Sequence, residues 1–211
     1  MTITSMDAYR TRTGRVLFTG AALGATGFFA AVAAGPLAAE DLTGTVAWSG
    51  LPGAIGIIGT AVGAGTVSAL QGRWGRRAGL STGYAVGVVG AILAALALRA
   101  GSFPLLLTAA VLFGIGHASN QLTRYVVAEL HPPIRRGRAL GWIVWAGTIG
   151  GVIGPSLLAP AGRAAQLGGL PALAGPYLVG ALAMAVVALA YQALLRPDPS
   201  VLAVAEDATA A

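Results

Sequence analysis

Six long apolar runs dominate the chain, and each is long enough to cross a lipid bilayer as a helix. A spanning helix needs roughly 20 predominantly apolar residues to cross about 30 Å of hydrocarbon. The runs that meet this length are Val16–Leu37, Val46–Leu70, Leu80–Leu98, Phe103–Val127, Ala139–Leu158 and Pro171–Leu195. They lack the apolar–polar alternation of barrel strands. The sequence therefore predicts an all-α integral membrane protein with six transmembrane helices.

The composition agrees with lipid as the main solvent of this chain. Hydrophobic residues make up 56% of the 211 positions and charged residues only 9%, with a mean hydropathy of +0.77. All 13 basic residues are arginines, and nearly all lie in short clusters between the apolar runs. Such clusters are a topology signal, so the net charge of +6 requires no nucleic-acid partner. Cysteine is absent, and we expect neither a metal nor a cofactor.

The arginines also predict the orientation of the chain, because cytoplasmic loops of membrane proteins carry an excess of basic residues. Two arginines, Arg99 and Arg163, fall on one side, whereas the other side carries Arg10, Arg12, Arg15, Arg73, Arg76, Arg77, Arg124, Arg135, Arg136, Arg138 and Arg196. Both termini are therefore expected in the cytoplasm, with the chain spanning the cell membrane. This divides it into a cytoplasmic segment (1–15), a six-helix transmembrane domain (16–195) and a flexible cytoplasmic tail (196–211).

The first apolar run invites two further expectations. It follows three arginines, as the core of a secretory signal peptide would, but it is longer than the usual core of about 7–15 residues, so we interpret it as a transmembrane helix. Glu40 and Asp41 follow it and are expected in the first outside loop.

Glycines recur at a four-residue spacing that allows close helix packing in membranes. The spacing occurs at Gly20/Gly24, Gly59/Gly63, Gly83/Gly87, Gly147/Gly151 and Gly150/Gly154. With 32 glycines in the chain some of these pairs arise by chance. Their number nevertheless predicts tightly packed helices that can slide or bend.

The fourth apolar run carries a polar stripe formed by His117, Asn120, Gln121 and Arg124. Their spacing of i, i+3, i+4 and i+7 places them on one helix face. Counting from Phe103 puts His117 about 21 Å and Arg124 about 31 Å along the helix. His117 lies within the hydrocarbon, where an ionisable residue suggests a substrate or proton pathway, or a neutral ring hydrogen-bonded to a neighbouring helix. Arg124 can reach the membrane surface.

The segment from Ser68 to Arg77, between the second and third runs, resembles the loop signature GxLaDRxGRR of the major facilitator superfamily. The signature is matched at four positions, Arg73, Gly75, Arg76 and Arg77. This resemblance implies a gating loop. Ser68 replaces the first glycine of the signature and Gly72 replaces its aspartate, so the charged latch that the family builds on that aspartate is in doubt. A loop that only fixes orientation remains the alternative.

The fifth run gives a second resemblance to the same family. Gly141, Gly150, Gly154 and Pro155 resemble the start of its antiporter signature Gx8Gx3GPx2GG, while Leu158 and Ala159 replace the final glycines. Gly150, Gly154 and Pro155 would form a hinge, since proline removes a backbone hydrogen bond and kinks a helix. The alternative is a small-residue packing face near a helix end. The segment from Ala128 to Gly141 is also similar to the family's loop between helices four and five.

Together these matches imply the N-terminal six-helix half of a transporter of that superfamily. We expect it to move a small-molecule substrate by alternating access, in an exporter- or antiporter-like manner. The polar stripe and the small residues of the first run would line the route. Because the family fold has two such halves, a homodimer or a second six-helix half is expected as partner. The alternatives are an accessory or regulatory membrane subunit, or a truncated, inactive half.

An enzyme is the class that the sequence argues against. His117 is the single histidine in a predicted span, no serine-nucleophile turn accompanies it, and the spans contain no aspartate or glutamate. Proton coupling would therefore have to use His117 or residues of a partner.

Overall fold

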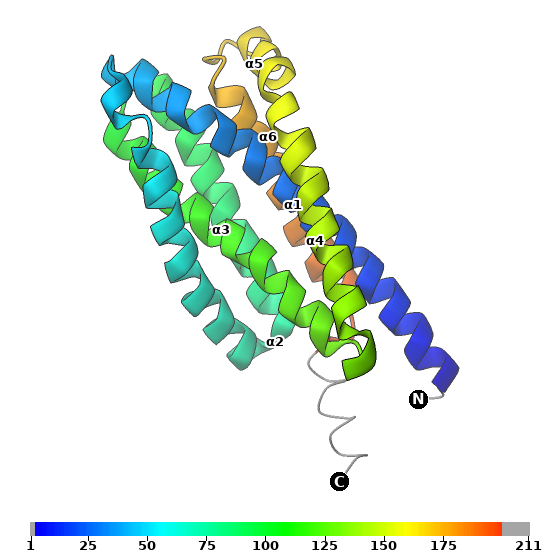
Figure 1. Cartoon of the computed structure of the whole chain (residues 1–211). Helices are drawn as coiled ribbons and strands as arrows, with labels where there is room; N and C mark the ends of the chain where they lie inside the picture. Colours follow the sequence, from blue (N-terminus) through cyan, green and yellow to red (C-terminus); the bar gives the residue numbers. More distant parts are fainter. Residues whose placement is uncertain (1–2, 200–211) are drawn as a thin grey trace.

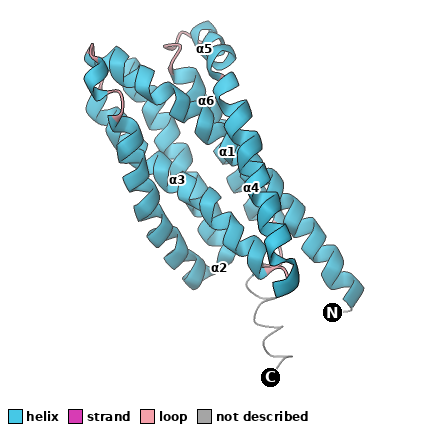
Figure 2. Ribbon diagram, in the orientation of Figure 1, coloured by secondary structure: helices cyan, strands magenta, loops and turns pink. Residues whose placement is uncertain are grey.

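The computed structural model describes residues 3–199, and every regular element within that range is a helix (Figure 1, Figure 2). In chain order the elements are α1 (Ile3–Thr43), the short 3-10 helix η1 (Val46–Trp48), α2 (Leu51–Ala100), α3 (Phe103–Glu129), α4 (Pro133–Ser156), α5 (Leu158–Leu167) and α6 (Ala174–Leu194). Five of them, α1, α2, α3, α4 and α6, are long and apolar enough to cross a membrane. The predicted all-α class is therefore confirmed.

Helix α2 folds back on itself at Gly75 (Figure 1). Gly75 has φ 89° and ψ 166°, a backbone conformation that is open essentially to glycine alone. The two arms of α2 pack against each other beside this turn. Gly79 contacts Gln71 and Gly83 contacts Val67, and both pairs are symmetric about Gly75. The second arm (76–100) contains the third apolar run, and the first arm (51–74) contains the second run from Leu51 onward, because Val46–Trp48 form η1.

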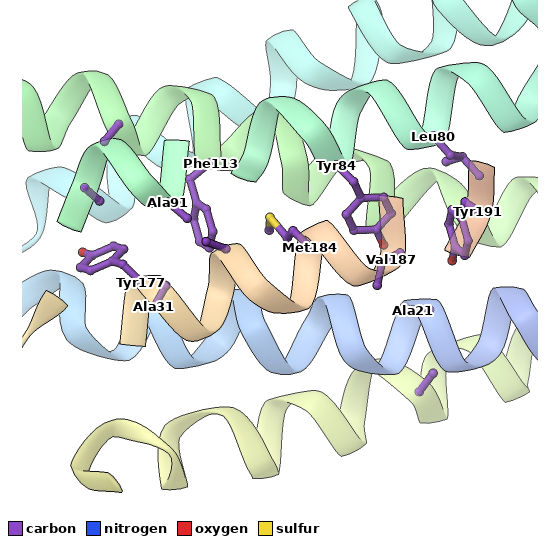
Figure 3. Packing of buried hydrophobic residues seen from close by; sticks show 14 of the residues in the cluster. Ala21, Ala31, Leu80, Tyr84, Ala91, Phe113, Tyr177, Met184, Val187 and Tyr191 are labelled. Atoms are coloured by element: carbon purple, nitrogen blue, oxygen red, sulfur yellow. The ribbon is translucent and has the colours of Figure 1, made fainter. Parts of the chain in front are cut away.

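The other helices pack around these two arms. Helix α3 lies against α2, α4 runs along α1, and α6 packs against both α1 and α2. Figure 3 shows Met184, Val187 and Tyr191 of α6 in the interior, near Tyr84 of α2. The rings of Tyr84 and Tyr191 meet edge to face with centroids 5.6 Å apart. Side chains contributed by five helices, α1, α2, α3, α4 and α6, thus form one continuous core.

Close contacts at glycines hold the helices together at four of the five predicted spacings. Gly20 and Gly24 meet side chains of other helices, whereas the other three spacings include contacts to backbone. Gly59 and Gly63 contact the α3 backbone, and a Cβ on Gly87 would lie 2.8 Å from the Cα of Gly116. At the fifth spacing, a Cβ on Gly147 would meet nothing within 4 Å. Gly147 therefore packs against nothing in the described part of the chain.

Several predicted boundaries differ from the structure. Helix α1 continues to Thr43, so the expectation that Glu40 and Asp41 lie in a loop is wrong. The reason is that a helix is held by backbone hydrogen bonds, which can continue past the edge of the hydrocarbon, where the side chains no longer need to be apolar. The sequence also missed α5, which is too short to span and packs on α6. Pro197 and Asp198 of the predicted tail form hydrogen bonds with the bundle, and the tail from residue 200 lies outside the described residues.

Candidate functional site

The polar stripe of α3 divides between two environments. His117 and Gln121, one helical turn apart, line a cavity of about 660 Å³. Asn120 is buried and donates a hydrogen bond from Nδ2 to the carbonyl oxygen of Ala21 in α1, at 2.9 Å. Asn120 therefore ties α3 to α1, and the cavity wall keeps two of the four predicted residues.

The cavity lies between α1 and the first arm of α2, and α3 forms its floor. On α3 it reaches from Leu106 to Gln121, about 22 Å along the helix axis. It opens at the surface of the bundle, because Gly53 and Ile57 on its α2 wall are exposed. Small residues of α1 such as Ala31 and Gly35 contribute to the wall, as the sequence predicted for the first helix.

Aromatic rings surround His117 at the inner part of the cavity. Phe28 of α1 stacks on the imidazole with ring centroids 3.6 Å apart and planes 11° apart. Phe28 also stacks on Phe113 at 5.4 Å, and Tyr177 of α6 meets Phe113 edge to face at 6.5 Å. The Nδ1 atom of His117 is buried and has no hydrogen-bond partner among residues 3–199. The alternative interpretation of His117 was a neutral ring that forms a hydrogen bond to a neighbouring helix. The structure shows no such bond at Nδ1.

Arg124 folds back onto its own helix. Its Nε donates to the carbonyl oxygen of Gln121 at 2.8 Å, and a terminal nitrogen donates to the Gln121 side-chain oxygen at 2.7 Å. The guanidinium carbon also lies 5.9 Å from the centre of the Tyr125 ring. Arg124 is not part of the cavity wall and instead orients the Gln121 amide.

The predicted gating loop is the turn of α2, and the structure supplies it with an acid that the sequence analysis missed. Asp198, which follows α6, accepts hydrogen bonds from the backbone N–H groups of Arg76 and Arg77 at 3.1 and 3.0 Å. These groups begin the second arm and have no partners within the helix, so the carboxylate acts as an N-terminal cap. A Cβ on Gly75 would lie 2.5 Å from Asp198, so glycine is needed here for space as well as for conformation.

The Arg76 side chain connects three segments at the same end of the bundle. It forms a two-pronged ion pair with Glu129 at the end of α3, including a bond of 3.0 Å from Nε. Its third nitrogen donates to the Gln71 side chain at 3.0 Å. Arg73, by contrast, is exposed, and a Cβ on Gly72 would meet nothing within 4 Å. An ion pair therefore exists beside this loop, although Gly72 occupies the acidic position of the signature.

The predicted hinge residues lie at a helix contact and at a helix end. A Cβ on Gly150 would overlap Ala25 and Thr26 of α1, and one on Gly154 would lie 2.8 Å from Phe29 and Ala30. Pro155 lies in the last turn of α4, one residue before the helix ends at Ser156. The two glycines thus let α4 approach α1, and the chain passes from the end of α4 through Leu157 into α5.

Several residues of these sites carried no signal that sequence reasoning could use. Phe28 and Tyr177 are single aromatic residues in apolar runs, where lipid contact and cavity contact look alike. Asp198 lies 122 residues after Arg76, and no local spacing relates them. Glu129 differs from these residues, because the sequence could have indicated its role. An acid at the end of a span near a basic loop is a natural ion-pair partner.

A family model and two curated relatives all relate this chain to the same family of membrane proteins. Residues 17–210 match the family model described as Major Facilitator Superfamily. The chain is 38% identical over 180 residues to the uncharacterized MFS-type transporter YdeG of Bacillus subtilis (strain 168), a match covering 85% of this chain and 42% of YdeG. It is 34% identical over 188 residues to the uncharacterized MFS-type transporter YddS of the same organism, covering 89% and 43%. The chain thus spans less than half the length of these relatives.

Proposed function

This chain belongs to the Major Facilitator Superfamily, and we propose that it moves a small molecule across the cell membrane by alternating access. It is a multi-pass membrane protein with apolar helices of spanning length. The observation that carries the proposal is the cavity between α1, α2 and α3, whose wall holds His117 and Gln121 deep along α3. Polar groups on the wall of an otherwise apolar cavity are the kind of feature that a transported molecule requires.

In this proposal the chain crosses the membrane six times. Each arm of α2 has about 25 residues, or about 37 Å of helix, so each is long enough to span the hydrocarbon. With six crossings the two termini lie on one side. We place them in the cytoplasm, because the turn at Gly75 and the start of α4 carry Arg73, Arg135, Arg136 and Arg138 at that end.

The proposal includes a second six-helix unit, either another copy of this chain or a separate half. Helix α4 is the least buried of the spanning helices, since 28% of the residues in its apolar 18-residue stretch are buried against the rest of the chain. Added Cβ atoms on Gly137, Gly141 and Gly147 of α4 would meet nothing within 4 Å. Rows of small residues of this kind allow another helix to pack closely in a membrane. The resemblance of Gly141, Gly150, Gly154 and Pro155 to an antiporter signature favours export by exchange.

Cysteine accessibility tests the alternating-access proposal directly, because the chain contains no cysteine of its own. Gln121→Cys would place a thiol in the cavity, and Leu189→Cys would place one on the exposed face of α6 as a control. Each variant is treated with a membrane-impermeant, positively charged methanethiosulfonate in right-side-out and in inside-out vesicles. We expect Gln121→Cys to react from both sides and Leu189→Cys from neither. Reaction of Gln121→Cys from one side only, or from neither, both in the chain alone and with a second six-helix chain co-expressed, would refute alternating access.

The second unit is tested by native mass spectrometry of the chain expressed alone and extracted gently. A dimer supports a pair of identical halves. A monomer that becomes reactive from both sides only when co-expressed with another six-helix chain supports a separate half. A monomer that passes the accessibility test alone would show that no second unit is required.

A further inference from the structure

We propose that the cavity binds a neutral, lipophilic molecule of drug-like size that carries one or two hydrogen-bonding groups. This inference rests on the proposed transport function and names the class of substrate that the same site would take. Three properties of the cavity support it: the chemistry of its wall, its dimensions, and the position of its few polar atoms.

The wall of the cavity is apolar and contains no aspartate, glutamate, lysine or arginine among the described residues. Most of its lining residues are glycine, alanine or aliphatic residues, and Phe28 and Phe113 join them. The nearest arginine along α3, Arg124, directs its hydrogen bonds to Gln121. A charged molecule in this site would lose its hydration without gaining a counter-charge, which is costly in an apolar environment. The wall therefore favours a neutral occupant.

The dimensions match a molecule of two or three rings. A volume of about 660 Å³ lies within the range of sites that bind drug-sized ligands. The shape is elongated, since the cavity follows α3 from Leu106 to Gln121. The rings of Phe28, Phe113 and Tyr177 give its inner part flat surfaces on which an aromatic ring can pack.

Two polar groups of the wall lie close together, at His117 and Gln121, whereas the hydroxyl groups of Ser49 and Thr60 donate to the carbonyl oxygens of Val46 and Gly56. The buried Nδ1 of His117 has no partner among the described residues. Gln121, one turn further along α3, uses its side-chain oxygen to accept from Arg124, which turns its amide N–H groups away from that bond. The pair can therefore serve a carbonyl or hydroxyl group at one end of an otherwise apolar molecule. An unpaired buried nitrogen is costly, and such a group would satisfy it.

Photolabelling tests the charge preference with three probes that share one scaffold. The purified full chain, in nanodiscs, is irradiated with benzophenone, with anionic 4-benzoylbenzoate, or with cationic (4-benzoylbenzyl)trimethylammonium, and the labelled peptides are identified by mass spectrometry. We expect benzophenone to label residues 49–64 and 106–121 selectively, and the charged probes to label them weakly. Equal labelling by a charged probe would overturn the neutral class. Uniform labelling of all lipid-exposed helices by benzophenone would overturn the site itself.

A matched pair of glycines in the first arm of α2 provides the control for location. Gly53 lines the cavity whereas Gly65 does not, and an added Cβ at either position would meet nothing within 4 Å. Gly53→Phe should fill part of the cavity and abolish most of the benzophenone labelling, while Gly65→Phe should leave it unchanged. Equal labelling in both variants would show that the label does not report the cavity.

The polar pair is tested by competition with two flat molecules that differ in one carbonyl group, fluorenone and fluorene. We expect fluorenone to compete against benzophenone labelling about fivefold better than fluorene, which is the equivalent of about one neutral hydrogen bond. Gln121→Leu or His117→Phe should remove most of that ratio, and His117→Phe keeps an aromatic ring beside Phe28. A ratio that survives in both variants would overturn the role of these residues.

The labelling results can be separated from those on the proposed function. Photolabelling is read in the resting protein, whereas alternating access is read from thiol reactivity on the two sides of a membrane. If Gln121→Cys reacts from both sides while benzophenone fails to label the cavity, the substrate class is wrong and the transport proposal stands. If labelling succeeds but the thiol reacts from one side, the cavity is a binding site without transport.

Discussion

Replacing Gly87 with alanine tests whether the second arm of α2 and α3 depend on direct backbone contact. The added Cβ would lie 2.8 Å from the Cα of Gly116 and 2.6 Å from the sulfur of Met184. Carbon atoms in ordinary contact lie about 3.5–4.0 Å apart, so the two helices would have to separate by roughly 1 Å. Met184 can change rotamer, but the α3 backbone cannot.

The magnitude follows from the cost of overpacking, which is about 1–3 kcal/mol for one extra carbon in a well-packed interior. For a chain of this size each kcal/mol changes the melting temperature by about 2–4 °C. We therefore expect Gly87→Ala to lower the apparent melting temperature by about 2–12 °C. The four tryptophans allow the transition to be followed by intrinsic fluorescence in detergent and in nanodiscs.

Two further variants decide whether the contact itself is responsible. Gly116→Ala adds a Cβ on the other side of the same contact, 2.6 Å from the Cα of Gly87, and should cost a similar amount. The double variant should cost less than the sum, because the helices separate once. Gly65→Ala, whose Cβ would meet nothing within 4 Å, should leave the melting temperature unchanged or raise it slightly. A Gly87→Ala protein as stable as the wild type would refute the reasoning.

Three further predictions concern the turn of α2. Asp198→Asn keeps the shape of the cap on the second arm but removes its charge, and should cost about 1 kcal/mol of stability, whereas Asp41→Asn at the exposed end of α1 should cost nothing measurable. Arg76→Gln and Glu129→Gln should each destabilise weakly, and a double-mutant cycle in thermal unfolding should give a coupling of about 0.5–1 kcal/mol, because both side chains are partly exposed; a coupling of zero would show that the pair contributes nothing. Gly75→Ala should be the most damaging of these changes, with a strain of about 1–3 kcal/mol in addition to its overlap with Asp198; a melting temperature equal to that of the wild type would contradict the assigned backbone conformation.

Part of the candidate site could be found without the structure. Polar residues within the apolar runs are few, so the sequence alone indicates His117 and Gln121 as candidate site residues. The structure places both on the cavity wall. Helical periodicity could not separate them from Asn120, because all three lie within about 100° of one another around the helix. The difference arises from α1, whose Ala21 carbonyl accepts the Asn120 hydrogen bond. A polar stripe therefore identifies a helix face that avoids lipid, but the neighbouring helix decides what each residue does.

The glycine pattern shows the same limit. The four-residue spacings predicted close contacts, and most of these glycines do lie against another helix. The spacing could not name the partner helix, and it gave Gly147 and Gly150 equal weight although one meets nothing and the other meets α1. Packing depends on the shapes of two surfaces, and a sequence pattern describes one of them.

The sequence by itself determined the class of this protein, because the length and apolar character of a helix that crosses lipid are local properties of the chain. It also determined the family, through motifs that are contiguous in the chain. Only the tertiary structure decided where the cavity lies, that Asp198 caps the second arm of α2, and that Glu129 pairs with Arg76. The physical reason is that the lipid and the interior of the helix bundle are about equally apolar. Hydrophobicity therefore shows which segments enter the membrane, but it does not show which helix faces contact each other there.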